Sequence, residues 1–284
     1  MRSESSSDKK FTPLVVVGWL LSLLVLFPLY IMVVNSFKSR QEIFTNQLSL
    51  PSSLSFDYYA QAIAQMGFLT ALGNSLLITG VSVVLIVVFS SMAAWVLERR
   101  KTKTSGFLYY MFIATMLIPF QAIMIPLIQY INKWQIPSLN FALLNTRYGL
   151  IFMNIGFGMS MAIFLFHGFI KTVPYEIEEA ATIDGCNKFQ LFWHIVFPVL
   201  TPTTVTVAIL NVLSLWNDYL LPSLTLRDLE LRTIPLSTFF FFGQFNIEWN
   251  LALAGLVLTI IPVILFYLFT QKYIIKGIAA GAIK

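Results

Sequence analysis

Few side chains in this sequence could carry out catalysis or bind a metal ion. The chain has two histidines, His167 and His194, and one cysteine, Cys186. Neither histidine stands in an H-E-x-x-H pattern or a similar ligand spacing, and a single cysteine excludes an internal disulfide and a Cys-based metal cluster. We therefore expect no metal ligands. We interpret the histidines as polar residues near a membrane boundary and Cys186 as a small packing residue.

Hydrolysis of ATP and acid–base catalysis are also disfavoured. The sequence has no G-x-x-x-x-G-K-[ST] phosphate loop, so we do not expect this chain to hydrolyse ATP itself. It also shows no nucleophile with its base and no carboxylate pair that would indicate a cleft. We therefore predict no catalytic residues, which disfavours a membrane enzyme.

One carboxylate, Asp218 in "SLWNDYLLP", falls within a long apolar run, near its end. Charged groups inside a membrane are expensive and usually functional, but one carboxylate at an interface makes a poor proton relay. Two interpretations of Asp218 stay open, a structural anchor and a part of an outer gate or transport pathway. Sodium symport is also left open, because it can rely on backbone carbonyls.

The composition indicates that these residues belong to a membrane protein. Of the 284 residues, 57% are hydrophobic and 11% are charged. The mean hydropathy of +0.78 is far too high for an ordinary soluble domain. The net charge of +5 does not indicate nucleic-acid binding, because the basic residues lie at the edges of apolar runs rather than on one basic face.

Six apolar runs are long enough to cross a hydrocarbon core, which takes about 20 helical residues. They lie near residues 14–35, 75–97, 107–131, 148–170, 199–221 and 251–271. The first run is longer than the apolar region of a signal peptide and no A-x-A cleavage pattern follows it, so we expect a span there. The sequence thus predicts an all-α integral membrane protein, with tails at 1–13 and 272–284 and a six-span domain at 14–271.

Lysine and arginine in the connecting segments predict the orientation of the spans. With the N-terminus inside, the inner segments hold twelve basic residues: Arg2, Lys9, Lys10, Arg99, Arg100, Lys101, Lys103, Lys171, Lys188, Lys272, Lys276 and Lys284. The outer segments then hold six: Lys38, Arg40, Lys133, Arg147, Arg227 and Arg232. We therefore predict a multi-pass protein of the cell (inner) membrane, with both termini in the cytoplasm.

Between the fourth and fifth predicted spans, on the predicted cytoplasmic side, lies "EEAATIDGCNKFQLFWHIVFPVLTP", residues 178–202. We expect Pro174 in the first turn of a helix, since its missing N–H costs nothing there. Three glutamates in or just after that turn, where the helix macrodipole favours negative charge, support the same start: Glu176, Glu178 and Glu179. Ala180 and Ala181 are predicted to leave a shallow patch on this helix.

Two capping signals predict a turn and a second helix in the same segment. Gly185 can end the first helix in a left-handed conformation. Asn187 and Gln190 have the spacing of a capping box at the start of a second helix, which we expect to run to Pro198. The result is a short helical hairpin, which we interpret either as a docking element for another protein or as a structural re-entry helix.

The length of this connection favours docking. Residues 171–198 make a connection of about 28 residues, where helix connections usually take two to eight. Its acidic start and small alanine side chains suit a groove on another protein, because small residues allow close backbone approach.

The same segment resembles the EAA loop of ABC-importer permeases, whose pattern is E-A-A, three residues, G, nine residues, then I-x-L-P. It falls here on Glu179, Ala180, Ala181, Gly185, Ile195 and Pro198, with Phe197 in place of the usual leucine. The resemblance extends over nearly the whole chain, to carbohydrate-type permeases similar to the second permease subunit of maltose and multiple-sugar importers. It also includes Asn74, Ser75, Trp216, Asn217, Asp218, Gly277 and Gly281.

This resemblance implies a type I ABC importer permease fold with a cytoplasmic coupling loop at residues 171–198. It implies a non-catalytic subunit that translocates a sugar or oligosaccharide delivered by an extracytoplasmic sugar-binding protein. The implied partners are a second homologous permease, two ATPase subunits that bind the ATP, the binding protein and membrane lipid. No cofactor on this chain is implied. A stand-alone ion-coupled secondary transporter is the alternative.

The resemblance also implies roles for particular residues. Those that couple to the ATPase would be Glu178, Glu179, Ala180, Ala181, Asp184, Gly185, Ile195 and Pro198, of which Glu179 and Gly185 are expected to matter most. The C-terminal tail is expected to touch the ATPase dimer. An outer gate or pathway role is expected for Trp216, Asn217 and Asp218, and residues 222–250 would reach towards the binding protein.

Overall fold

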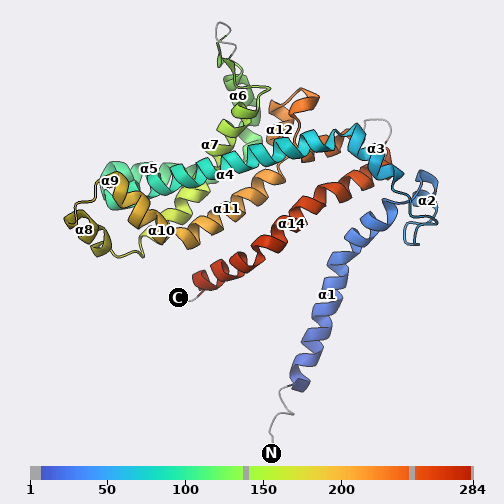
Figure 1. Cartoon of the computed structure of the whole chain (residues 1–284), viewed down its shortest axis with the longest axis horizontal. Coiled ribbons are helices and arrows are strands. Elements are labelled where there is room, and N and C mark those ends of the chain that lie inside the picture. Colours follow the sequence, from blue (N-terminus) through green and yellow to red (C-terminus); the bar gives the residue numbers. More distant parts are fainter. Residues whose placement is uncertain (1–7, 137–140, 243–246, 283–284) are drawn as a thin grey trace, which may run out of the picture. The chain divides into compact units, whose positions relative to one another are not determined.

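The computed structural model describes residues 8–136, 141–242 and 247–282, and nearly all of its regular structure is helical (Figure 1). The chain divides into two compact units. The first comprises Met1–Phe68 and Thr238–Val263, and the second comprises Leu69–Ser237 and Ile264–Lys284.

The first unit contains both long and short helices and has a small apolar core. Its elements are α1 (Asp8–Asn35), α2 (Arg40–Thr45), α3 (Asp57–Gln65), η4 (Phe239–Phe241) and the beginning of α14 (Trp249–Ala282). The α2 helix begins with a capping box, in which Ser39 and Glu42 each accept the other's backbone N–H. The core of the unit is formed by Ala62, Met66, Phe241, Leu251, Ala252 and Ala254.

The second unit contains the remaining elements. The first of them are α4 (Phe68–Arg99), which is long, α5 (Lys103–Met116), α6 (Phe120–Ile131), β1 (Gln135–Ile136), β2 (Phe141–Ala142) and α7 (Arg147–Ile170). After these come α8 (Glu176–Ile183), α9 (Lys188–Gln190), the π-helical η2 (Leu191–Val196), α10 (Phe197–Val199), α11 (Thr201–Trp216), α12 (Leu220–Thr225), η3 (Leu229–Leu231) and α13 (Ile234–Thr238). The two short strands pair antiparallel. The main core of the unit joins α4 and α7 to the segment between α8 and α11.

Small residues bring α4, α7 and α11 close together. Three serines of α4 are fully buried, Ser82, Ser90 and Ser91, and small side chains of this kind allow helices in a membrane to approach closely. Gly158 of α7 acts in the same way: a Cβ there would lie 2.7 Å from Oδ1 of Asn211 in α11 and would overlap the Ile86 side chain of α4.

Candidate membrane spans in the described part of the chain correspond to the six predicted runs, and the all-α membrane fold is confirmed. Four are single helices: Val15–Asn35, Phe68–Arg99, Arg147–Ile170 and Trp249–Lys272. The other two are bent pairs, with an angle of 106° between Lys103–Met116 and Phe120–Ile131 and of 76° between Lys188–Val199 and Thr201–Trp216. The third predicted span is therefore bent within its length, whereas the second bend, at Leu200, lies at the beginning of the fifth predicted span.

Proline accounts for both breaks. Pro119 has extended backbone angles and disfavours a helical conformation at Ile118, the residue before it. In the second pair, Pro202 has no N–H to donate to the Pro198 carbonyl four residues earlier. The Thr201 hydroxyl donates to that carbonyl instead, at 2.6 Å.

The ends of three predicted segments also differ from expectation. The α11 helix ends at Trp216 and not at residue 221, because the Asp218 side chain accepts the N–H groups of Leu220 and Leu221, at 3.0 and 3.4 Å, at the start of α12. Helix α1 begins at Asp8 and α14 continues to Ala282, within the segments predicted as tails. Residues 1–7 and 283–284 lie outside the described part.

Candidate functional site: the hairpin and a polar cavity

Residues 171–198, the hairpin, contain α8 as their first helix, and its first turn carries the three predicted glutamates. Pro174 precedes this helix and its N-cap, Tyr175, so it lies just before the predicted position in the first turn. The helix ends in a Schellman motif: the Cys186 N–H donates to the Ala181 carbonyl at 3.0 Å and the Gly185 N–H to the Thr182 carbonyl at 3.1 Å. Gly185 has a φ of 91°, which confirms the predicted left-handed stop.

The second half of the hairpin begins at Asn187, as predicted. The Asn187 side chain accepts the N–H groups of Phe189 and Gln190, at 3.0 and 2.9 Å, and the Gln190 side chain accepts the Asn187 N–H at 3.0 Å. The helix continues as a π-helical segment and then as α10, which ends at Val199. It therefore ends one residue beyond the predicted end at Pro198.

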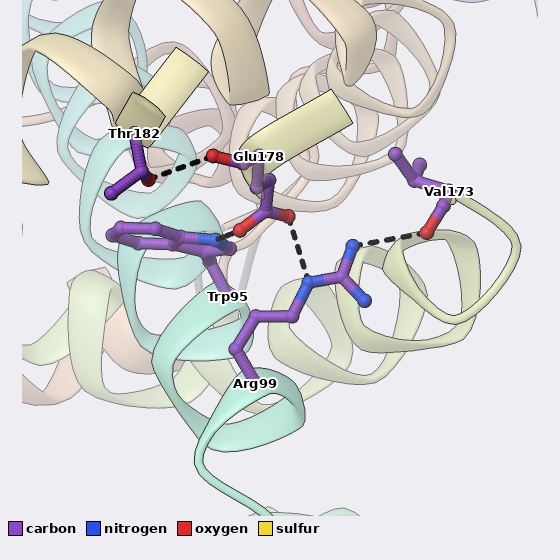
Figure 2. Close-up of polar contacts among 5 residues, drawn as sticks. All are labelled: Trp95, Arg99, Val173, Glu178 and Thr182. Atoms are coloured by element: carbon purple, nitrogen blue, oxygen red, sulfur yellow. Dashed lines mark hydrogen bonds and ion pairs between the residues drawn. The ribbon is translucent and has the colours of Figure 1, made fainter. Parts of the chain in front are cut away.

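The inward face of α8 holds Glu178, whose side chain is only 5% exposed. Figure 2 shows the contacts of its carboxylate: Oε1 accepts from Arg99 Nε at 2.7 Å and Oε2 accepts from Trp95 Nε1 at 2.9 Å. Arg99 also donates through Nη2 to the Val173 carbonyl at 3.0 Å, and its guanidinium lies 5.6 Å from the centre of the Tyr175 ring. The hairpin is thus tied to the last turn of α4 by a buried ion pair.

The outward face of α8 is partly apolar. Ala180 and Glu179 are exposed, and Ile183, three residues beyond Ala180 and hence on the same face, is 86% exposed. The expectation that Ala180 and Ala181 form one patch is wrong, because consecutive helical residues point in different directions and Ala181 is buried in the core.

The remaining predicted coupling residues divide between the surface and the core. Asp184, Gly185 and Pro198 are exposed, and Ile195 is half-buried and packs against the main core of the unit. The structure therefore places Glu179, Ala180, Asp184 and Gly185 together on the exposed end of the hairpin, and directs Glu178 and Ala181 inward.

A cavity of about 390 Å³ lies in the second unit, between the broken third span, α7, α11 and α12. Its polar lining side chains are Gln121, Asn154, Asn211, Ser214 and Asp218, and its aromatic ones are Phe120 and Phe157. Asn154 and Asn211 are 4% and 6% exposed, so they are buried amides in otherwise apolar spans. A cavity that combines apolar walls with a few polar groups is typical of a binding site for a small molecule.

Of the three residues predicted for a gate or pathway, the structure brings one to this cavity. Asp218 lines the cavity, and it also caps α12 through the two contacts described above. Trp216 is buried and Asn217 is exposed and donates to the Leu213 carbonyl of its own helix at 2.8 Å. Neither of these two residues lines the cavity.

Sequence reasoning missed Arg99 and Trp95 as partners of the hairpin, and it did not assign the two buried asparagines. The spacing of Trp95 and Arg99, four residues apart, places both on one face of a helix, and this was an available signal. Isolated amides within apolar spans, such as Asn154 and Asn211, were a second signal available from the sequence.

The family of the chain follows from comparison with known sequences. Residues 86–280 match the profile of a family described as binding-protein-dependent transport system inner membrane component. The chain belongs to this family. Its members are transport permeases rather than enzymes, so this protein is a membrane-embedded component of a transport system. Family membership favours this function over a stand-alone ion-coupled transporter.

Two relatives are similar to this permease over nearly their whole lengths. A probable starch degradation products transport system permease protein of Thermoanaerobacterium thermosulfurigenes is 46% identical, over 94% of each chain. The melibiose/raffinose/stachyose import permease protein of Bacillus subtilis is 32% identical, over 90% of this chain and 91% of its own.

The fold of the permease is also that of a solved transporter. A chain in the crystal structure of a bacterial ABC transporter involved in the import of the acidic polysaccharide alginate matches with a TM-score of 0.80 and 24% identity. The match covers 96% of this permease and 99% of that chain. The type I importer permease fold predicted from the sequence is therefore confirmed.

Proposed function

We propose that this permease imports a sugar or an oligosaccharide, as one of two related permease subunits served by an extracytoplasmic binding protein and by two ATPase subunits that bind the ATP. The relatives whose names mention starch degradation products or melibiose, raffinose and stachyose support a sugar as the substrate. The predicted orientation, with both termini and the hairpin in the cytoplasm, is part of this proposal.

The hairpin is the observation that carries the proposal. Its outer face exposes Ala180 and the apolar Ile183 beside Glu179 and Asp184, and an exposed apolar patch with a polar rim is typical of a protein interface. Its inner face is fixed to α4 through Glu178. A projection that is rigid at its base and apolar at its tip suits docking into a cleft of an ATPase subunit.

We further propose that the polar cavity is part of the sugar pathway. The amides of Gln121, Asn154 and Asn211 and the carboxylate of Asp218 can exchange hydrogen bonds with sugar hydroxyls, and Phe120 and Phe157 offer faces for the apolar side of a sugar ring. Phe120 and Gln121 of the lining follow directly after the break at Pro119, and irregular backbone at membrane depth is tolerated where it lines a cavity.

The first test is purification of the tagged chain in mild detergent from its own host. The proposal predicts that a second permease and two copies of an ATPase purify with it. The complex in proteoliposomes should then take up maltotriose, melibiose or raffinose only when ATP and the binding protein are present. Uptake by the isolated chain, driven by a sodium or proton gradient without ATP, would contradict the proposal.

A second test separates the two roles of Asp218. Asp218→Asn keeps a side-chain oxygen that can accept the N–H groups of Leu220 and Leu221 but removes the charge in the cavity. We expect KM for sugar uptake to rise severalfold with an unchanged melting temperature, while Asn217→Ala, outside the cavity, changes neither. Unchanged uptake by Asp218→Asn, together with destabilisation by Asp218→Ala, would leave only the capping role.

A further inference from the structure

The last turn of α4 contacts both the hairpin and the helix that precedes it. Trp95 and Arg99 lie on one face of α4 because they are four residues apart, and both donate to the same carboxylate, that of Glu178 (Figure 2). Arg99 extends the contact to the Val173 carbonyl in the connection between α7 and α8. One arginine thus fixes both the first turn of α8 and the part of the hairpin that precedes this helix.

The neighbouring residue of α4 makes a second tie. Glu98 Oε2 lies 3.0 Å from Nε2 of His167, near the end of α7, and both side chains are largely buried. The His167 ring stacks on Tyr109 of α5 at a centroid distance of 3.8 Å. The end of α4 is therefore joined through adjacent residues to α5, to α7 and to the hairpin.

Apolar packing holds the other side of the hairpin to the same place. Ala181, Leu191 and Phe192 belong to the core formed with α4 and α7, and the Phe192 ring lies 5.5 Å from that of Trp95. Trp95 therefore packs against the second half of the hairpin while it donates a hydrogen bond to the first half. A hairpin that is held on both sides in this way has few ways to hinge relative to α4.

We propose that Arg99 and Glu178 are positioning residues for transport, which make the hairpin and the end of α4 move as one rigid body. This inference rests on the function proposed above, in which an ATPase moves the hairpin. Glu178 faces inward and transmits the motion to α4, whereas Glu179, beside it on the exposed face, is free to meet the ATPase. The two adjacent glutamates therefore have different tasks.

The geometry gives a specific reason for arginine at residue 99. A planar guanidinium donates from Nε and Nη2 in fixed directions, and here these directions meet Glu178 and Val173 at once. Lysine has a single nitrogen and cannot reproduce this fixed fork. Arg99→Lys should therefore keep the charge balance and lose part of the rigidity.

The test uses the complete complex, with ATPase subunits and binding protein, in proteoliposomes and with maltotriose as the probe sugar. The variants are Arg99→Gln, Arg99→Lys, Glu178→Gln and the double variant of Arg99→Gln with Glu178→Gln. Arg100→Gln and Glu176→Gln are matched controls, because both residues are exposed and lie one and two residues from Arg99 and Glu178 in sequence. The measurements are ATP hydrolysis and maltotriose uptake per ATP, both relative to the amount of assembled complex.

We expect Arg99→Gln and Glu178→Gln to assemble and hydrolyse ATP, but to lower uptake per ATP by roughly tenfold, within the usual range of coupling between two sites. Arg99→Lys should lose less. The double variant should recover part of the loss, because two neutral amides can bond to each other and leave no buried charge unpaired. Both controls should behave as wild type.

Two results would overturn the inference. Uptake per ATP in the single variants equal to that of the controls would show that the pair has no role in coupling. A loss explained entirely by less assembled complex would show that the pair only stabilises the protein. Failure of the wild-type chain to assemble with any ATPase is a different result, because it refutes the proposed function as well.

Discussion

The two ends of α4 are held by different chemistry. At the hairpin end, Glu178 is held by an arginine and a tryptophan, so the contact is a charged one. At the other end, Asn74 donates from Nδ2 to the carbonyls of Glu230 and Arg232, at 2.8 and 3.0 Å. Its Oδ1 accepts from Arg147 Nε at 2.7 Å.

Ser75 adds to the second end by accepting the Ile234 N–H at 2.8 Å. This end therefore uses amide and hydroxyl groups to hold the backbone of residues 230–234, whatever side chains that segment carries. The residues 74 and 99 are separated by about 37 Å along the helix, at 1.5 Å per residue, which is enough to cross a hydrocarbon core.

The difference indicates different tolerance to mutation. A charged pair with buried partners is costly to break on one side, because the remaining charge is left without compensation. At the other end, the hydrogen bonds to the backbone of residues 230–234 are neutral and each contributes about 0.5–1.5 kcal/mol net; the bond that Arg147 donates to Asn74 is the one with a charged donor described there. We expect single substitutions at the hairpin end of α4 to cause a large loss of transport. Single substitutions at the other end should each lower the stability by a smaller amount.

The largest effect is expected in the hairpin itself, at Gly185. Its φ of 91° is a conformation that side chains rarely adopt, although a Cβ there would meet no atom within 4 Å. Gly185→Val should therefore cost about 1–2 kcal/mol of local strain, enough to lower the ratio of correctly folded to misfolded hairpin by a factor of about 5–30. We expect uptake to fall to near zero while the protein remains in the membrane.

Asparagine is the matched control for this glycine, because it tolerates the left-handed conformation. Gly185→Asn should retain clearly more uptake than Gly185→Val at equal protein level, as judged by immunoblot of membranes. Equal loss in both variants would point to the bulk of the side chain at a docking surface instead of backbone strain.

The next effect is expected at the other end of α4. Asn74→Ala removes two donated hydrogen bonds and one accepted one, and should lower the free energy of unfolding by about 2–3 kcal/mol. Thermal unfolding in detergent measures this loss, and limited proteolysis within residues 226–237 should become faster. Asn217→Ala is the control, since that exposed side chain bonds only within its own helix; an equal shift in both would contradict the proposed anchor.

The hairpin was predictable from sequence because its signals are local. Asn187 and Gln190 of the capping box are three residues apart, and Gly185 ends a helix because of its own conformational freedom. Neither of these two signals depends on the rest of the fold. The inward position of Glu178 was not predictable in this way. It depends on Arg99, 79 residues away in sequence, and the adjacent Glu179 has the same local chemistry.

The spans show the same limit. Hydropathy located the four single-helix spans and the regions of the two bent pairs, because length and apolar composition are enough for that. It carries no information on the direction in which a helix turns. The bends at Pro119 and Pro202 come from the backbone chemistry of proline, which an average hydropathy over a window does not record. The polar cavity was harder still, because its asparagines come from different helices and line one cavity only in the folded chain, where α7 and α11 approach closely at Gly158.

Trp95→Phe tests the hairpin end of α4 without changing any charge there. Phenylalanine keeps an aromatic ring to pack against Phe192, loses the Nε1–H that donates to Glu178, and fills less volume than the indole. A hydrogen bond to a charged group contributes about 1.5–3 kcal/mol, so we expect a loss of about 2 kcal/mol in thermal unfolding. Trp134→Phe is the control, because Trp134 is 50% exposed. Equal stability of both variants would mean that Arg99 alone holds Glu178.

The smallest effect is expected at Ser75, and it completes the comparison of charged and neutral contacts. Ser75→Ala removes one neutral hydrogen bond, from the Ile234 N–H, and should cost about 1 kcal/mol in thermal unfolding, roughly half the loss in Trp95→Phe. Ser223→Ala is the control, because the Ser223 hydroxyl donates only to the Leu220 carbonyl of its own helix. If Ser75→Ala cost as much as Trp95→Phe, charge would not be what distinguishes the two ends of α4. The difference would then have to come from how deeply each contact is buried.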